Sequence, residues 1–181
     1  MKIMVLNGSP RPKGNTSTLV KHFKEGAEES GNEVTVFNLD SMNISGCKGC
    51  FGGNIKDPNS PCVQKDDMDK IYPVYKDADI VVLASPLYYW NLSGQLRTAF
   101  DRLFAVEETV PNWRSHEKGA ILLMAAEGDA FDIAVQYYKT LLEHLNWKNL
   151  GIILAGGVNN IGDIEGSNKL NEVKELGASL K

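Results

Sequence analysis

Five short apolar runs rich in β-branched residues recur along this chain, and their recurrence constrains the fold more than any other feature. They occupy residues 2–6, 33–38, 79–84, 119–125 and 150–155, with segments of helical periodicity between them. Strands that are apolar throughout need helices over both faces, so this alternation is typical of a parallel sheet in an α/β domain. We predict one domain over residues 1–181, with strand order 2-1-3-4-5 and the ligand at the carboxyl ends of the strands.

The segment between the second and third runs departs from this regularity. Met68, Ile71 and Tyr75 have helical spacing, but Pro73 falls among them. Proline removes a hydrogen-bond donor and costs roughly 3 kcal/mol inside a helix. We therefore expect a short helix near 66–72 that bends or breaks at the proline.

The first run leads into the loop that carries the strongest functional signal. A stretch of Ser, Pro, Gly and Arg residues follows the run and opens into an amphipathic helix. A strand, a turn and a helix N-terminus form an anion site, because free backbone N–H groups and the helix dipole point to one spot. Ser9, Thr16 and Ser17 add hydroxyl donors and Arg11 adds a cation, so we predict a phosphate site.

The details of this loop narrow the ligand. Gly14 is followed by Asn15-Thr16 where a nucleoside-triphosphate loop would carry Lys-Ser/Thr, and no G-x-G-x-x-G motif opens the helix. A hydroxyl-rich loop without either feature suits one terminal phosphate monoester, and FMN is the commonest cofactor held in that way. The alternative is an ordinary strand-to-helix turn in which Ser and Thr only cap the helix.

Two further loops are expected at the same edge of the sheet. Residues 85–94 follow the third run and include consecutive aromatics at 88–90, whose diverging side chains cannot all be core. Residues 125–129 follow the fourth run, and the small residues there would let a planar ring approach closely. Both loops favour a flavin ring at this edge, and Asp129 is a possible N-cap of the next helix. The alternative for the aromatics is a surface plug or a dimer contact.

Charge and composition exclude several classes of function. Lys and Arg total 19 against 23 for Asp and Glu, giving a net charge of −4 and a pI near 5.4. No basic face for nucleic acid is therefore expected. The apolar runs are far shorter than a membrane span, the first run leaves no room for a signal peptide, and three cysteines are too few for a disulfide scaffold. We predict a cytoplasmic protein with no nucleic-acid or membrane partner.

Several motifs together resemble a known family. They are Gly8-Ser-Pro-Arg-x-x-Gly-Asn-Thr-Ser17, Ser85-Pro-x-Tyr-Tyr89, Gly94-x-x-Arg-x-x-x-Asp-Arg102, Gly157-Val158 and Gly162-Asp163-Ile164. This combination is similar to the NADPH-dependent FMN reductases of the flavodoxin-like superfamily. Gly46-Cys47-Lys-Gly-Cys50, followed by Cys62, is similar to the iron–sulfur flavoprotein-like branch of that family. The resemblance implies a flavodoxin-like three-layer sandwich.

The resemblance also implies an activity and a set of site residues. The chain would be an oxidoreductase and flavoprotein with tightly bound FMN, reduced by NADH or NADPH, and it would form a homodimer or tetramer. Electrons would pass to a quinone, a flavin, a metal or another small acceptor. The phosphate would be held by Ser9, Arg11, Asn15, Thr16 and Ser17, and the ring would be bordered by Pro86, Leu87, Tyr88, Tyr89 and Asn91 and closed by Glu127 and Gly128.

Flavin chemistry asks little of side chains, because the cofactor carries the reaction and the protein supplies binding, orientation and electrostatics. We therefore predict no general acid or base. Backbone N–H groups around 87–91 are expected to stabilise the negative charge that develops near N1 of the reduced ring.

The cysteines depart from the pattern of the iron–sulfur branch. Cys47 and Cys50 fit the first pair of a C-x-x-C-x-x-C motif, but Gly53 stands at the third position and only Cys62 remains. A cubane cluster usually takes four thiolates, and no His lies nearby to complete a zinc site. We predict no metal. The open interpretations are a relic of a cluster loop, a redox-active Cys47–Cys50 pair, and a cluster or metal site completed by a non-Cys ligand.

Related functions would share these motifs. A quinone or azo reductase would differ only in the acceptor. A flavodoxin-like electron-transfer protein would bind FMN but turn over nicotinamide poorly, and a cofactor-free interaction protein would bind no flavin. The sequence favours an FMN-dependent NAD(P)H oxidoreductase over these alternatives.

Overall fold

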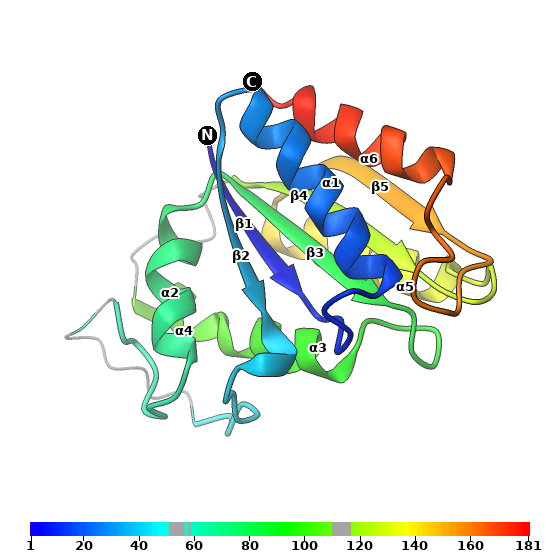
Figure 1. Ribbon diagram of the computed structural model, residues 1–181. Helices are drawn as coiled ribbons and strands as arrows, with labels where there is room; N and C mark the ends of the chain where they lie inside the picture. Colours follow the sequence, from blue (N-terminus) through cyan, green and yellow to red (C-terminus); the bar gives the residue numbers. More distant parts are fainter. Residues whose placement is uncertain (51–56, 58, 110–116) are drawn as a thin grey trace.

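The sheet at the centre of the molecule has the expected strands. The computed structural model describes residues 1–50, 57, 59–109 and 117–181. The elements are β1 (Lys2–Asn7), α1 (Asn15–Glu29), β2 (Glu33–Asn38), η1 (Leu39–Ser41), α2 (Met68–Asp77), β3 (Ile80–Pro86), α3 (Gly94–Arg102), α4 (Phe104–Thr109), β4 (Gly119–Ala125), α5 (Asp132–Leu145), β5 (Lys148–Ala155) and α6 (Asn168–Ala178). The strands are parallel in the order β2-β1-β3-β4-β5, which confirms the flavodoxin-like α/β prediction (Figure 1).

Helices cover both faces of this sheet (Figure 1). On one face α1 and α6 pack over the strands, and Val5, Phe23 and Val173 are fully buried there. On the other face α2, α3, α4 and α5 enclose a second apolar layer that includes Leu83 and Tyr138. Because both faces are covered, the strands are apolar throughout rather than alternating.

The two helices on the first face cross where each carries a glycine. A Cβ added to Gly26 would lie 2.9 Å from the carbonyl carbon of Lys174, and one added to Gly177 would lie 2.8 Å from the amide nitrogen of Ala27. The backbones of α1 and α6 therefore touch directly at this crossing. The position of α1, and of the loop that precedes it, is set by contact with α6.

Helix α2 is longer than the predicted helix near 66–72, and it does not break at Pro73 as one form of that prediction expected. The helix runs from Met68 to Asp77 with Pro73 inside it. Its apolar face, which includes Tyr72 and Tyr75, is almost completely buried. Burying each large side chain stabilises by roughly 1.5–3 kcal/mol, which offsets the roughly 3 kcal/mol cost of an internal proline.

The expected cap of α5 was also wrong. The N-cap is Phe131, and its backbone N–H donates to the carbonyl of Asp129 at 2.9 Å. The Asp129 side chain lies instead against Gly156, where a Cβ would overlap it. By contrast, Ser93 caps α3 and accepts from the N–H of Leu96 at 3.3 Å.

A lysine is buried where β4 begins. Lys118 is 5% exposed, its Nζ donates to the carbonyl of Ala78, and it lies 5.4 Å from the centre of the Tyr75 ring. Burial lowers the pKa of Lys118 to about 8, although Asp79 and Asp77 act to raise it. The ammonium group therefore carries a desolvation cost at neutral pH.

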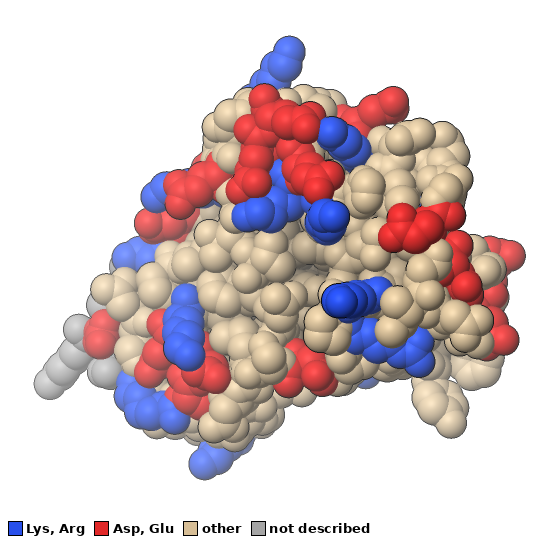
Figure 2. Space-filling model, viewed as in Figure 1, with Lys and Arg blue, Asp and Glu red and all other residues tan. Residues whose placement is uncertain are grey.

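Charges of both signs are interspersed over α1 and α6 on the face shown in Figure 2. Among the helices of the described ranges, none has the length and apolar character needed to cross a bilayer.

Candidate functional site

A pocket opens at the carboxyl ends of β1, β3, β4 and β5, where the fold places a ligand. The loop after each of these strands contributes to it. Its walls are Ser9, Arg11, Gly14, Asn15, Thr16, Pro86, Leu87, Tyr88, Ala125, Ala126, Glu127, Val158 and Asn159. Eight of the residues implied by the family resemblance are therefore brought together, namely Ser9, Arg11, Asn15, Thr16, Pro86, Leu87, Tyr88 and Glu127.

One end of the pocket is the N-terminus of α1. Gly14 is the N-cap, and no side chain caps the helix. The first intrahelical bond runs from the N–H of Thr18 to the carbonyl of Gly14. Within the described residues, the N–H groups of Asn15, Thr16 and Ser17 have no acceptor. Free N–H groups at the positive end of a fifteen-residue helix are the donor set that a phosphate requires.

The loop before α1 is stabilised by hydrogen bonds to the carbonyl and the N–H of Arg11. The Ser9 hydroxyl accepts from the N–H of Arg11 at 3.2 Å, and the Ser17 hydroxyl donates to the carbonyl of Arg11 at 2.9 Å. Gly14 closes the turn on the same carbonyl at 2.9 Å, and a Cβ there would lie 2.8 Å from the Arg11 Cβ. The structure thus places Ser17 outside the pocket walls, where it supports the loop, whereas Thr16 lines the pocket.

The loop that follows β5 is hydrogen-bonded to the loop before α1. Arg11 Nη1 donates to the carbonyl of Asn159 at 3.0 Å, and Asn15 Nδ2 donates to the carbonyl of Asn160 at 2.9 Å. Asn15 Oδ1 accepts from the N–H of Ile164 at 3.3 Å. Val158 and Asn159 of this loop also line the pocket, and our site prediction missed them. The only sequence signal was the Gly157-Val158 motif.

The aromatic loop forms the opposite wall and ends in a tight turn. The N–H of Leu87 donates to the carbonyl of Ala125 at 3.1 Å, which joins the ends of β3 and β4. Tyr88 and Asn91 exchange backbone hydrogen bonds of 3.0 and 3.1 Å. Between them Tyr89 and Trp90 have φ of 47° and 58°, as in a type I′ turn. Such angles strain bulky side chains.

This geometry separates the predicted ring contacts. Tyr88 lines the pocket and is 43% exposed, whereas Tyr89 is 95% exposed and outside its walls. Asn91 also lies outside the walls, and its side chain accepts from the N–H of Leu92 at 2.8 Å. The N–H groups of Leu87, Tyr88 and Asn91 already have acceptors, so the backbone donors expected around 87–91 reduce to those of Tyr89 and Trp90.

The loop after β4 forms the remaining wall. Ala125, Ala126 and Glu127 line the pocket, and Gly128 does not. The carbonyl of Glu127 accepts from the N–H of Gly157 at 3.1 Å, which binds this wall to the loop after β5. The four loops around the pocket therefore form one hydrogen-bonded unit.

The cysteine segment, residues 46–62, contributes none of its described residues to the pocket walls. Cys47 and Cys50 are exposed and Cys62 is buried, while the stretch that contains Gly53 lies outside the described residues. Among the residues that the structure describes, no group of three His, Cys, Asp or Glu side chains is arranged to hold a metal ion.

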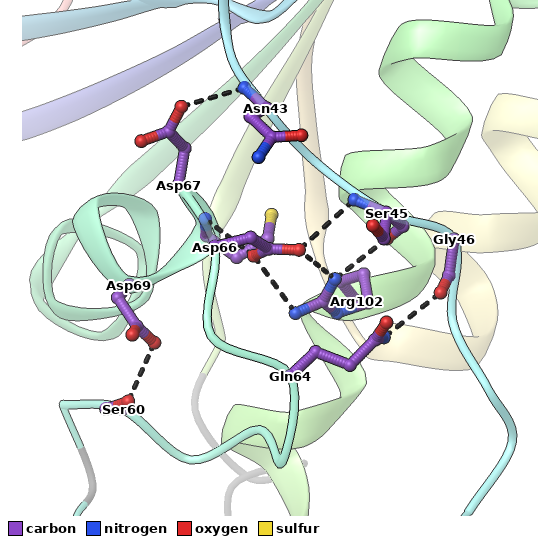
Figure 3. A network of polar contacts seen from close by, with 10 residues as sticks. Asn43, Ser45, Gly46, Ser60, Gln64, Asp66, Asp67, Asp69 and Arg102 are labelled. Carbon is purple, nitrogen blue, oxygen red and sulfur yellow. Dashed lines mark hydrogen bonds and ion pairs between the residues drawn. The ribbon is translucent and has the colours of Figure 1, made fainter.

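A buried ion pair holds the two ends of this segment together (Figure 3). Arg102 Nη1 donates to Asp66 Oδ2 at 2.8 Å and to the carbonyl of Ser45 at 2.8 Å, and the two side chains are 1% and 6% exposed. Burial opposes ionisation of Asp66, but hydrogen bonds from Arg102, Ser45 and Met68 outweigh it and leave its pKa below the ordinary value. The motif that ends in Arg102 therefore anchors the cysteine segment and does not reach the pocket.

The fold and the pocket agree with the relatives of this chain. The model of the NADPH-dependent FMN reductase family matches residues 1–158, and the chain belongs to that family. Family membership makes it an oxidoreductase with FMN as its cofactor.

Several sequence relatives are named iron–sulfur flavoproteins, the branch that the cysteine motif resembles. An iron–sulfur flavoprotein of Archaeoglobus fulgidus is 31% identical over 183 residues, covering 99% of this chain and 79% of the relative. One from Methanosarcina thermophila is 36% identical over 102 residues, which is 56% of this chain and 52% of the relative. Several such alignments span only about half of the relative's length.

Solved structures share the fold at lower identity. An NAD(P)H:quinone oxidoreductase from Methanothermobacter marburgensis superposes with a TM-score of 0.73 at 19% identity, over 99% of this chain and 95% of the other. An FMN-dependent NADH-azoreductase from Bacillus anthracis, in complex with FMN, gives a TM-score of 0.72 at 18% identity, over 98% of each chain.

Proposed function

We propose that this chain passes electrons from NADH or NADPH through bound FMN to a small acceptor such as a quinone, a flavin or a metal. The observation that carries the proposal is the uncapped N-terminus of α1, which opens into a pocket walled by four strand ends. That arrangement supplies anion donors at one end and an aromatic and small-residue cleft at the other. The structural neighbours named as quinone reductase and azoreductase support an acceptor of this class.

The phosphate of FMN fits the α1 end of the pocket. The N–H groups of Asn15, Thr16 and Ser17 would donate to it, together with the Thr16 hydroxyl. Arg11 would add a cation from the rim. Gly14 is required because a side chain there would lie against Arg11. In this assignment Asn15 contributes its backbone, since its side chain is already engaged with the loop after β5.

The ring of FMN fits between Pro86, Leu87 and Tyr88 on one wall and residues 125–127 on the other. When bound, FMN accepts hydride at N5, and it can deliver electrons in one or two steps. The chain's part is to bind and orient the ring. The N–H groups of Tyr89 and Trp90 are the backbone donors left in that loop to stabilise negative charge near N1.

An absorbance spectrum of the purified protein tests the cofactor, and stopped-flow reduction by NADPH tests the activity. We expect flavin peaks that bleach rapidly when nicotinamide is added. A flavin that stays oxidised for minutes would assign the chain to electron carriers instead. A colourless protein that binds no added FMN would contradict the whole proposal.

A second candidate, an iron–sulfur flavoprotein, is favoured by the names of the sequence relatives. With three cysteines, we propose that the chain holds no ordinary four-iron cluster, because a cubane usually takes four thiolates. Anaerobic reconstitution with iron and sulfide should leave FMN bound and less than one cluster per chain. About four irons and four sulfides per chain would contradict this proposal and would require Asp57, Asp66 or a partner subunit to supply the missing ligand.

We also propose a homodimer or tetramer, as the family resemblance implies. Light scattering of the FMN-loaded protein should give at least twice the chain mass.

A further inference from the structure

The loop between β5 and α6 is organised by a carboxylate outside the pocket walls. Asp163 Oδ2 accepts hydrogen bonds from the backbone N–H groups of Asn159 at 2.9 Å and Asn160 at 2.6 Å. These two bonds hold the pKa of Asp163 below its ordinary value. Gly162, with φ of 92°, lets the chain turn back so that the carboxylate reaches both groups. One carboxylate oxygen thus binds two successive N–H groups of the turn, which is also closed by a backbone hydrogen bond of 3.2 Å from the N–H of Asp163 to the carbonyl of Asn160.

The two carbonyls of that turn face the phosphate loop. The carbonyl of Asn159 accepts from Arg11 Nη1, and the carbonyl of Asn160 accepts from Asn15 Nδ2. The buried Ile164 returns a hydrogen bond from its N–H to Asn15 Oδ1. Asn15 is the first residue of α1, so the turn holds both the rim cation and the helix end that carries the free N–H groups.

We propose that Asp163 is a positioning residue that makes this protein prefer FMN to riboflavin. By fixing the turn at Asn159–Asn160, it holds Arg11 and Asn15 where the flavin phosphate binds. The inference rests on the proposed function, and it adds a residue that lines no part of the pocket. The phosphate is the ligand group that depends most on Asp163, because the side chains held by this turn, Arg11 and Asn15, lie at the α1 end of the pocket.

The sign of the effect separates this role from simple electrostatics. Asp163 is negative, and the phosphate of FMN carries about −1.5 to −2 charge at pH 7. Removing a nearby like charge would tighten FMN binding. Removing a carboxylate that holds the turn in place would weaken FMN binding instead. Riboflavin has no phosphate, so neither effect should change its affinity much.

The experiment measures dissociation constants of FMN and riboflavin for the apoprotein by flavin fluorescence. Asp163→Ala should weaken FMN at least about tenfold, a loss of about 1.4 kcal/mol, and riboflavin less than about twofold. Asp163→Asn keeps one carbonyl oxygen that can accept from both N–H groups, so it should retain most of the preference for FMN over riboflavin. Asp163→Glu keeps the charge but displaces the oxygen, so it should lose the preference for FMN over riboflavin, as Asp163→Ala does.

The matched control is Glu165→Ala, which removes an exposed carboxylate from the same loop. It should leave the FMN-to-riboflavin ratio unchanged or raise it. Tighter FMN binding by Asp163→Ala, or an equal loss of FMN and riboflavin in both alanine and glutamate variants, would overturn the inference. If the parent protein binds neither flavin, the proposed function fails instead, so the two failures are distinguishable.

Discussion

Asp66 and Asp163 each organise a loop by accepting two backbone N–H groups, yet their surroundings differ. Asp66 accepts from Ser45 and Met68, and it is buried against Arg102. Asp163 accepts from two neighbouring groups of its own turn and is exposed. The pKa of each carboxyl is below its ordinary value.

Burial decides what such a carboxylate does in the fold. A buried charge is costly to leave without its partner, so Asp66 ties the stability of the fold to the position of the cysteine segment. An exposed carboxylate can be removed with little desolvation cost, so Asp163 affects mainly the geometry of its own turn. We expect the first residue to control unfolding and the second to control ligand preference.

The largest effect should come from breaking the buried pair. Asp66→Ala leaves the Arg102 guanidinium buried without its counter-ion, which should cost about 3–5 kcal/mol of unfolding free energy. Urea unfolding of the apoprotein measures this. Replacing both partners, as in Asp66→Leu with Arg102→Met, should recover much of the loss. Unchanged stability of the single variant would erase the difference between the two aspartates.

A second variant tests the α1 end of the pocket, where we propose that the FMN phosphate binds. Arg11→Ala with Thr16→Ala removes two donors to a charged acceptor and should weaken FMN binding by about 2–5 kcal/mol. Equilibrium titration measures the loss, and riboflavin should bind almost as before. Ser17→Ala is the control, because its hydroxyl lies behind the loop and should matter much less. If the double variant retains FMN through desalting as the parent does, the phosphate binds elsewhere.

Lys118 extends the comparison to a buried cation. Its native pKa of about 8 lies below the ordinary lysine value, so the unfolded chain binds more protons between about pH 8 and 10.5. Stability should therefore rise with pH across that window, by about 2–3 kcal/mol relative to Lys118→Met. Urea unfolding of both proteins at pH 7.5 and pH 10 gives the difference. Lys148→Met, an exposed control, keeps Lys118, so its stability should rise with pH as that of the parent does.

The smallest effect concerns the strained aromatic turn. Tyr89→Asn with Trp90→Gly installs the residues that a type I′ turn prefers, so the apoprotein should gain about 1–2 kcal/mol. Thermal unfolding measures the gain. Replacing Tyr88, which is outside the strained pair, with Asn should give no gain. A loss of stability in the double variant would mean that the two rings pack against something that compensates for their backbone strain.

Local sequence patterns predicted the sheet and eight of the thirteen residues that line the pocket. Apolar runs mark strands wherever both faces are covered, and the hydroxyl-rich loop after β1 marks an uncapped helix. Pro73 was misjudged because burial of Tyr72 and Tyr75 outweighs a local penalty. The role of Asp163 was not predictable, because Arg11 and Asn159 are 148 positions apart and only the fold brings them together. The side chain of Ser17 lies outside the pocket walls while that of Thr16 lines them, because one step along a helix turns a side chain by about 100°.

The contact of α1 and α6 at Gly26 and Gly177 affects when the cofactor loop can form during synthesis of the chain. The loop before α1 is synthesised well before α6, yet α1 rests on the backbone of α6. Domains acquire such long-range contacts only after the distant segment is available. Nascent chains should therefore be unable to hold flavin until synthesis has passed α6. A larger residue at Gly26 or Gly177 would separate the helices, so the first consequence of a change at the C-terminal end would be felt at the N-terminal cofactor loop.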